Sequence, residues 1–210
     1  MGLSCPASAI LCLFLSPSYL TFTQSSSPTS NTTVLDAEGY DLQPNTMYYV
    51  FPVQRTGKGG GLALASRDRR CPYYVIEENN ELSNGLSLRF VAVDNKPTAI
   101  SLSTDLNFVF NAATICVQST TWRLGDVDDV TGHRYVISGG RTGRPGVDTV
   151  SNWFKIEKFE DGDGYKIVFC PSVCNFCKVV CGNVGVFIEN GKRWLGLSDE
   201  PLVVMFKKVG

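Results

Sequence analysis

The chain has 210 residues and an almost neutral charge, with 19 Lys and Arg against 20 Asp and Glu. Nucleic acid is therefore excluded as the expected partner, because phosphate binding depends on a field of clustered Lys and Arg. Hydrophobic residues make up 43% of the chain, enough for a buried core, and the 20 glycines favour many strands joined by turns.

The N-terminal segment differs from the rest of the chain. Residues 7–16 read ASAILCLFLS, which matches the apolar core of a signal peptide and is too short for a membrane span of about 20 residues. No Lys or Arg precedes Arg55, so a buried N-terminal strand is the alternative. We expect a signal peptide over residues 1–25 and therefore a secreted protein, extracellular or vacuolar, with no membrane partner.

A polar linker separates this segment from the rest. Residues 26–33 are rich in Ser, Thr and Pro, a composition that does not pack into a core. Within the linker, Asn31 begins an Asn-Thr-Thr glycosylation sequon. We expect one folded domain over residues 34–210.

Short runs rich in Val, Ile, Phe, Tyr and Trp recur along the chain in sets of four. The first runs of the three sets start at Tyr48, Leu106 and Tyr165, which lie 58 and 59 residues apart. The expected strands are 48–51, 62–65, 74–77, 88–91, 106–110, 122–124, 134–138, 153–156, 165–169, 184–188, 193–197 and 202–206.

Twelve strands in three similar units predict an all-β fold, a β-trefoil with pseudo-threefold symmetry and almost no helix. In this fold a six-stranded barrel is closed at one end by three hairpins, which removes exposed sheet edges. A twelve-stranded sandwich is the alternative. The near-equal spacing of the sets favours the trefoil.

Six cysteines follow the expected signal peptide, and an even number in an exported chain suggests disulfides. They are Cys71, Cys116, Cys170, Cys174, Cys177 and Cys181. The last four form a C-x3-C-x2-C-x3-C cluster, which could bind zinc or use its central C-x-x-C as a redox pair. Both alternatives suit a reducing compartment better than the secretory route. We therefore expect disulfides and neither metal nor other cofactor.

Catalytic signals are weak throughout the chain. His133 is the only histidine, and no G-x-S-x-G motif accompanies it. Asp126, Asp128 and Asp129 could supply a glycosidase acid pair, but a solvated turn is the simpler interpretation. No Gln-x-Trp triplet of carbohydrate-binding trefoils occurs. We expect a binding protein rather than an enzyme.

Two glycine-containing runs weakly resemble a phosphate-binding loop and a calcium-binding loop. Gly59–Gly61 lacks the Lys-Ser or Lys-Thr that a phosphate loop needs, so a tight turn between strands is expected. Asp161–Gly164 lacks the remaining ligands of a calcium loop, and a hairpin turn is expected there.

Several segments follow, in order, the pattern of one known family. They are Val34–Gly39 with Tyr48–Val50, Ser151–Glu157, Tyr165–Pro171, Cys170–Cys181 and Leu197–Leu202. Together they resemble the plant Kunitz (soybean-type) protease inhibitor family, and the cysteine cluster resembles its miraculin-like branch. The resemblance covers roughly residues 34–209.

The resemblance implies a β-trefoil and, as partner, a protease, of serine type rather than cysteine type. A non-inhibitory storage, stress or ligand-binding role is the alternative, since some members have such roles. The resemblance also implies three disulfides: Cys71–Cys116, and Cys170–Cys181 around Cys174–Cys177.

The resemblance further implies an inhibitory loop between the fourth and fifth strands. Its residues are Asp94, Asn95, Lys96, Pro97 and Thr98. A trypsin-like pocket binds Lys or Arg, and Lys96 is the only basic residue in this loop. Pro97 would then follow the scissile bond, where it has no N–H and restricts Lys96. We expect weak or no inhibition of trypsin, with Asn95 or Ala99 as the alternative primary residue.

Overall fold

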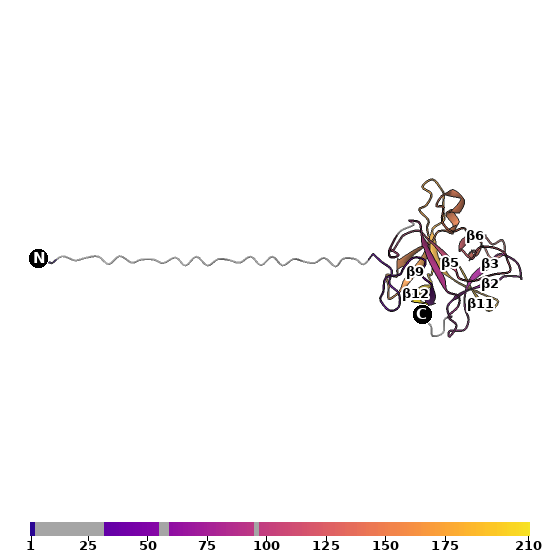
Figure 1. The fold of residues 1–210 in the computed structure, drawn as a ribbon, viewed down its shortest axis with the longest axis horizontal. Coiled ribbons are helices and arrows are strands. Elements are labelled where there is room, and N and C mark those ends of the chain that lie inside the picture. The colour runs from indigo at the N-terminus through magenta and orange to yellow at the C-terminus, as the bar shows by residue number, and fades with distance from the viewer. Residues whose placement is uncertain (3–31, 55–58, 95–96) are drawn as a thin grey trace. The chain divides into compact units, whose positions relative to one another are not determined.

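The computed structural model describes residues 1–2, 32–54, 59–94 and 97–210 (Figure 1). The chain divides into two units, residues 1–30 and 31–210, and the description below concerns the second. The expected signal peptide lies almost wholly outside the described residues, and so does the sequon residue Asn31. None of the described helices is long and apolar enough to span a membrane.

Twelve strands and one short 3-10 helix make up the described part of the second unit. The strands are β1 (Tyr48–Pro52), β2 (Leu62–Ser66), β3 (Tyr73–Glu77), β4 (Leu88–Ala92), β5 (Leu106–Phe110), β6 (Arg123–Val127), β7 (Arg134–Ile137), β8 (Lys155–Lys158), β9 (Tyr165–Phe169), β10 (Gly182–Glu189), β11 (Lys192–Ser198) and β12 (Val203–Lys208). The helix, η1, spans Val147–Asn152.

Six of these strands form a closed barrel. Strand β1 pairs with β4 and β12, β4 pairs with β5, and β9 pairs with β8 and β12, all antiparallel. The ring closes between β5 and the residue before β8, where Leu106 and Phe154 exchange both backbone hydrogen bonds, at 2.8 and 2.9 Å. Closure satisfies the edge groups that an open sheet would expose.

Three hairpins, β2–β3, β6–β7 and β10–β11, cap one end of the barrel. Their second strands meet in a triangle, because β3 pairs with β7, β7 with β11, and β11 with β3. In Figure 1 the barrel strands β5, β9 and β12 lie to the left and the cap strands β2, β3, β6 and β11 to the right. The predicted β-trefoil is confirmed, and the alternative sandwich is wrong.

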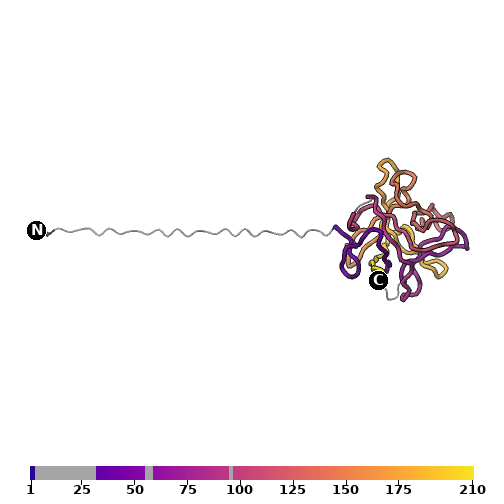
Figure 2. The backbone as a smooth tube through the Cα atoms, in the orientation of Figure 1, coloured from indigo at the N-terminus to yellow at the C-terminus, as the bar shows by residue number. Residues whose placement is uncertain are grey.

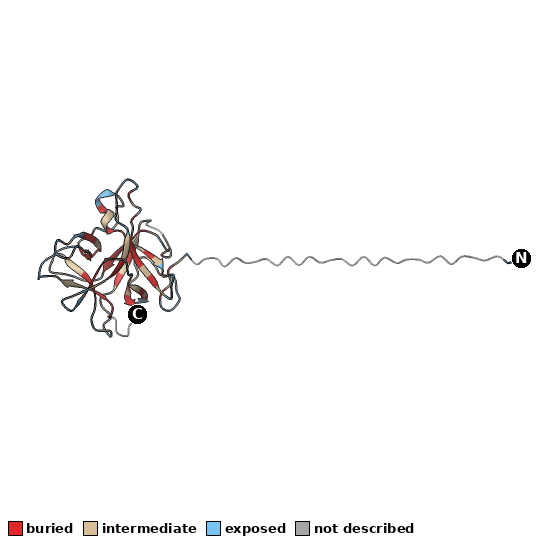
Figure 3. Ribbon diagram, turned by 180° about the vertical axis from the view of Figure 1, so that it is seen from behind, coloured by how far each residue is buried: buried red, intermediate tan, exposed pale blue. Residues whose placement is uncertain are grey.

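Aromatic residues from all three four-stranded units fill the core. Phe90, Phe108, Phe154 and Phe206 are fully buried, and the rings of Phe90 and Phe108 meet edge-to-face with centroids 4.9 Å apart. Phe90 also meets Phe206 at 5.4 Å, and Phe108 meets Phe154 at 5.9 Å. Such pairs contribute about 0.5–1.5 kcal/mol each beyond their burial. The buried positions concentrate on the strands and the exposed ones on the connections (Figure 3).

The eighth strand starts later than the sequence predicts. We expected a strand over 153–156, whereas β8 begins at Lys155, two residues after Trp153, which follows the end of η1 at Asn152. The Trp153 indole is fully buried and donates a hydrogen bond to Thr149 Oγ1 in η1, at 3.2 Å. This tertiary contact stabilises η1, a helix that the local sequence does not predict.

The run Gly59–Gly61 is a site of close packing rather than a tight turn. All three glycines are buried, and a Cβ on Gly60 or Gly61 would lie 2.2 or 2.0 Å from the carbonyl oxygens of Asn80 and Asn84. Real Cβ atoms do not approach a carbonyl oxygen so closely, so only glycine fits. The expected turn at Asp161–Gly164 is present and joins β8 to β9.

The three disulfides that the family resemblance implies are all formed. Cys71 pairs with Cys116, Cys170 with Cys181, and Cys174 with Cys177. The sequence separations are 45, 11 and 3 residues. Among the described residues no group of His, Cys, Asp or Glu is arranged to hold a metal ion.

Loop length predicts which disulfide the fold depends on most. Replacing Cys71 and Cys116 together by Ser should lower the free energy of unfolding by about 4 kcal/mol, because a long loop is no longer closed in the unfolded chain. Replacing Cys174 and Cys177 should cost about 2 kcal/mol. Guanidinium denaturation of both double variants measures the order, and the reverse order would contradict the prediction.

Candidate functional site

The connection between β4 and β5 holds the predicted inhibitory loop. Asp94 and Thr98 are exposed and Pro97 is half-buried, while Asn95 and Lys96 lie outside the described residues. Within the described part of this loop, neither Pro97 nor Thr98 takes part in a backbone hydrogen bond. Pro97 and Thr98 are therefore free of backbone pairing with the described part of the chain.

Both ends of this connection are held firmly. At the start, the Val93 N–H donates to the Asp105 carbonyl at 3.0 Å, which extends the β4–β5 pairing by one step. At the far end, the Ile100 N–H donates to the Leu42 carbonyl at 2.7 Å, and the Val34 N–H donates to the Ile100 carbonyl at 2.9 Å. The Ile100 side chain is 1% exposed. The segment before β1 thus fixes where the loop re-enters the body.

A second connection, residues 170–181 between β9 and β10, carries two of the three disulfides. Cys174 is 8% exposed, whereas Phe176 is 80% exposed at the turn that the Cys174–Cys177 bridge closes. The outer bridge, Cys170–Cys181, joins the two ends of the connection across a Cα–Cα distance of 4.5 Å. This loop projects from the upper edge of the barrel in Figure 2.

Asp105 links the two connections. Its carboxylate is 6% exposed and accepts hydrogen bonds from the Ser172 N–H at 3.1 Å and the Ser172 hydroxyl at 2.7 Å. Lys155 lies 4.0 Å from the same carboxylate and donates to the Ser172 hydroxyl at 3.0 Å. Since the Asp105 carbonyl also holds Val93, one residue anchors the bases of both loops.

No sequence pattern marks Asp105, Ser172 or Lys155 as part of a site. Asp105 directly precedes β5 and Lys155 begins β8, so each is adjacent in sequence to a recognised strand. Their contact depends on the pairing of Leu106 with Phe154, which are 48 residues apart in the printed sequence. No local pattern reports that pairing.

Comparison with known proteins identifies the family of the chain. A sequence profile described as "Trypsin and protease inhibitor", of the legume Kunitz family, matches residues 34–208. The chain belongs to this Kunitz family. It is 46% identical to Kunitz trypsin inhibitor 5 of Arabidopsis thaliana, over 83% of this chain and 85% of that protein.

Two further relatives have names other than trypsin inhibitor. The chain is 42% identical to miraculin of Synsepalum dulcificum, over 83% of this chain and 82% of that one. The solved structure of the rice (Oryza sativa) bifunctional α-amylase/subtilisin inhibitor superposes with a TM-score of 0.67 and 37% identity, covering 84% of this chain and 98% of that one. The fold of the family is therefore common to relatives with different described activities.

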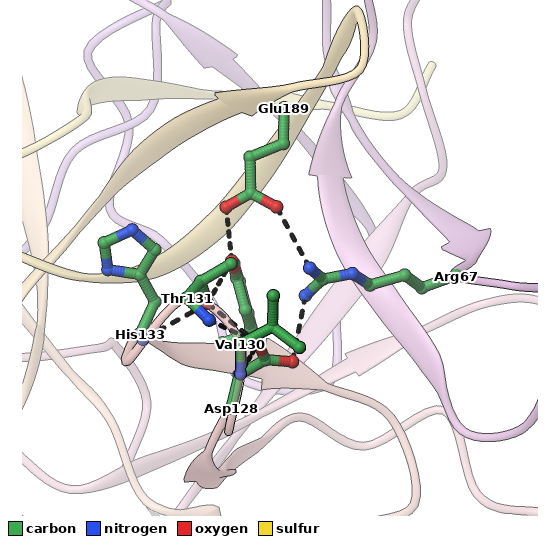
Figure 4. A network of polar contacts seen from close by, with 7 residues as sticks. Arg67, Asp128, Val130, Thr131, His133 and Glu189 are labelled. Carbon is green, nitrogen blue, oxygen red and sulfur yellow. Dashed lines mark hydrogen bonds and ion pairs between the residues drawn. The ribbon is translucent and has the colours of Figure 1, made fainter.

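Of the residues that the sequence offered as catalytic, Asp128 belongs to a polar network in the hairpin cap (Figure 4). Arg67 pairs with Asp128 at 3.3 Å and with Glu189 at 3.1 Å. The Arg67 guanidinium also lies 4.7 Å from the centre of the Tyr135 ring, and the Tyr135 hydroxyl donates to Glu189. Burial raises the pKa of Tyr135, and its hydrogen bond to Glu189 raises it further.

Asp128 and His133 are both occupied by structural contacts. Asp128 Oδ1 accepts hydrogen bonds from the N–H groups of Val130 and Thr131, at 3.2 and 2.9 Å, and its other oxygen meets Arg67. The His133 ring stacks on Phe187 with centroids 3.8 Å apart. Asp126 and Asp129 are exposed. Asp126 lies on strand β6 and Asp128 is half-buried in its ion pair, so the solvated-turn interpretation holds for Asp129 and is wrong for the other two.

The pKa of the Asp128 carboxyl is lowered, chiefly by the hydrogen bond from the Thr131 N–H. A lowered pKa in the folded state means that folding favours the charged form. The resulting stability is fully present above the unfolded value of about 3.9 and is lost as the pH falls through the folded value.

The Asp128→Asn variant tests this dependence. At pH 7 it should melt about 2–4 °C below the wild type, which corresponds to about 1 kcal/mol in a domain of this size. The difference should shrink as the pH falls below the unfolded value of about 3.9 and through the lowered folded pKa, because the wild-type carboxyl then loses its charge as well. Asp129→Asn, at an exposed neighbour, is the matched control and should leave the melting temperature unchanged. A difference that does not shrink at all as the pH is lowered from 7 into the acid range would contradict the assignment.

Proposed function

We propose that this Kunitz-family protein is an exported inhibitor that binds a serine protease through the loop of residues 94–98. One observation carries the proposal: the loop is fixed at both ends by Val93 and Ile100, while Pro97 and Thr98 between them make no backbone hydrogen bond with any described residue. A loop held in place before binding loses little conformational entropy when a protease binds it. Its backbone at Pro97 and Thr98 can then add to the enzyme as part of a strand.

The residue in the primary pocket sets the class of protease. Lys96 precedes Pro97, and a proline after the scissile bond removes a backbone donor and restricts the lysine. We therefore propose a target whose pocket accepts a neutral residue such as Asn95 or Ala99. The description of the rice relative as a subtilisin inhibitor supports a target outside the trypsin class.

Export completes the proposal. Residues 1–25 would be removed as a signal peptide, and the linker of residues 26–33 would carry a glycan at Asn31. The three disulfides support this route, because such bonds persist in oxidising compartments. The protein would act by binding, with neither catalytic residues nor cofactor.

An inhibition panel tests the function directly. The mature domain should inhibit at least one of subtilisin, chymotrypsin and elastase, and papain should be unaffected. Asn95→Gly combined with Lys96→Gly should weaken that inhibition at least tenfold, because glycine removes the primary side chain and adds flexibility. The matched control is Glu160→Gly combined with Asp161→Gly in the exposed β8–β9 connection. A wild type that inhibits none of these enzymes would favour the non-inhibitory role.

The obstacle at Pro97 has its own test. Lys96→Ala should change trypsin inhibition less than threefold, because Lys96 does not dock in the pocket. Pro97→Ile should tighten trypsin binding by this loop at least tenfold, since it restores a backbone donor worth about 0.5–1.5 kcal/mol and frees the preceding residue. If Lys96→Ala abolishes trypsin inhibition, the role given to Pro97 is wrong.

A further inference from the structure

The connection of residues 170–181 has a feature that the proposed function does not use. Lys178 and Val180 are exposed, and Val179 between them is half-buried. This short stretch lies between Cys177 and Cys181, each of which is held by its own disulfide. An exposed tripeptide is therefore covalently pinned at both ends.

The inner disulfide fixes the residue directly before Lys178. Cys177 is bonded to Cys174, which is 8% exposed and so is held in the body of the protein. At the base of the same connection, Ser172 donates two hydrogen bonds to the buried carboxylate of Asp105. The loop is thus preorganised by covalent bonds and by a buried anchor, which reduces the entropy lost on binding.

The backbone of the tripeptide is free to pair with a partner. In the described structure, residues 178–180 make no backbone–backbone hydrogen bond and contain neither a turn nor a bend. None of the three has a positive φ. These are the properties of a segment that can add to a protease as an extended strand.

Side-chain chemistry selects Lys178 within this loop. Phe176 is more exposed, but it lies in the turn closed by the Cys174–Cys177 bridge, and a protease binds an extended chain. Lys178 follows that turn and makes no ion pair with any described residue. Its ammonium group fits a primary pocket that ends in a carboxylate. The next residue is Val179, which keeps the N–H that Pro97 lacks.

We propose that residues 177–180 form a second inhibitory loop, directed at trypsin-like serine proteases, with Lys178 in the acidic primary pocket. This loop is distinct from residues 94–98, although Asp105 anchors both. The expectation of weak trypsin inhibition rested on Lys96 alone. Under this proposal, weak inhibition is a property of the 94–98 loop, whereas the whole protein inhibits trypsin through Lys178.

Substitutions at Lys178 test the proposal on the disulfide-bonded mature protein. The wild type should inhibit trypsin, Lys178→Ala should weaken that inhibition at least 100-fold, and Lys178→Arg should retain it within tenfold. Lys96→Ala is the matched control at the other loop and should leave it unchanged. Thermal unfolding of all variants should coincide, because the Lys178 side chain is exposed. Pro97→Ile, examined in the Lys178→Ala background, reports on the first loop alone.

Three outcomes would overturn the proposal: a wild type that does not inhibit trypsin, equal inhibition by the wild type and Lys178→Ala, or rapid cleavage after Lys178 without a lasting complex. A separate set of measurements shows whether the 94–98 loop fails to inhibit. Lys178→Ala should leave inhibition of subtilisin, chymotrypsin or elastase intact, whereas the Asn95→Gly, Lys96→Gly variant should lose it and keep trypsin inhibition.

Discussion

The pairing of Leu106 with Phe154 is the interaction on which the rest of the structure depends. It closes the six-stranded ring between β5 and β8, and both side chains are fully buried. Asp105 directly precedes Leu106 and Lys155 directly follows Phe154, so closure of the ring also brings an acid and a base to the same rim. The β4–β5 register places Ala92 opposite Leu106, so Val93 reaches Asp105 as well. The anchor of both loops is thus a consequence of barrel closure.

In the hairpin cap, ion pairs likewise join parts of the chain that are distant in sequence. Arg67 directly follows β2, Asp128 directly follows β6, and Glu189 ends β10, so three equivalent positions hold one cation and two anions. Partly buried ion pairs of this kind give modest net stability, since desolvation offsets much of their attraction. Their geometry requires all three hairpins in one register. The network therefore contributes more to the specificity of the assembly than to its free energy.

The sequence predicted what depends on local patterns. Runs of β-branched and aromatic residues located all twelve strands, and the 58- and 59-residue recurrence identified the trefoil. It did not predict η1, because the helix is held by the tertiary contact of Trp153 with Thr149. It assigned Gly59–Gly61 to a turn because a glycine run looks alike whether it serves a positive φ or a close approach. The anchor at Asp105 was missed for a related reason, since it exists only once distant strands have paired.

The two loops that Asp105 anchors are held by different interactions, one by backbone hydrogen bonds and the other by disulfides. This difference bears on which side chains each loop can change. The connection that contains residues 94–98 is held by backbone hydrogen bonds at Val93 and Ile100, which lie outside that range, so this support does not depend on the side chains within it. Residues 177–180 are positioned by disulfides and by the Ser172–Asp105 contact, which likewise spare the exposed side chains. In both cases the support is independent of the residues that would meet a partner. Such a scaffold can change its exposed loop residues with little loss of stability, which is consistent with one fold in relatives described as inhibitors of trypsin and of α-amylase and subtilisin.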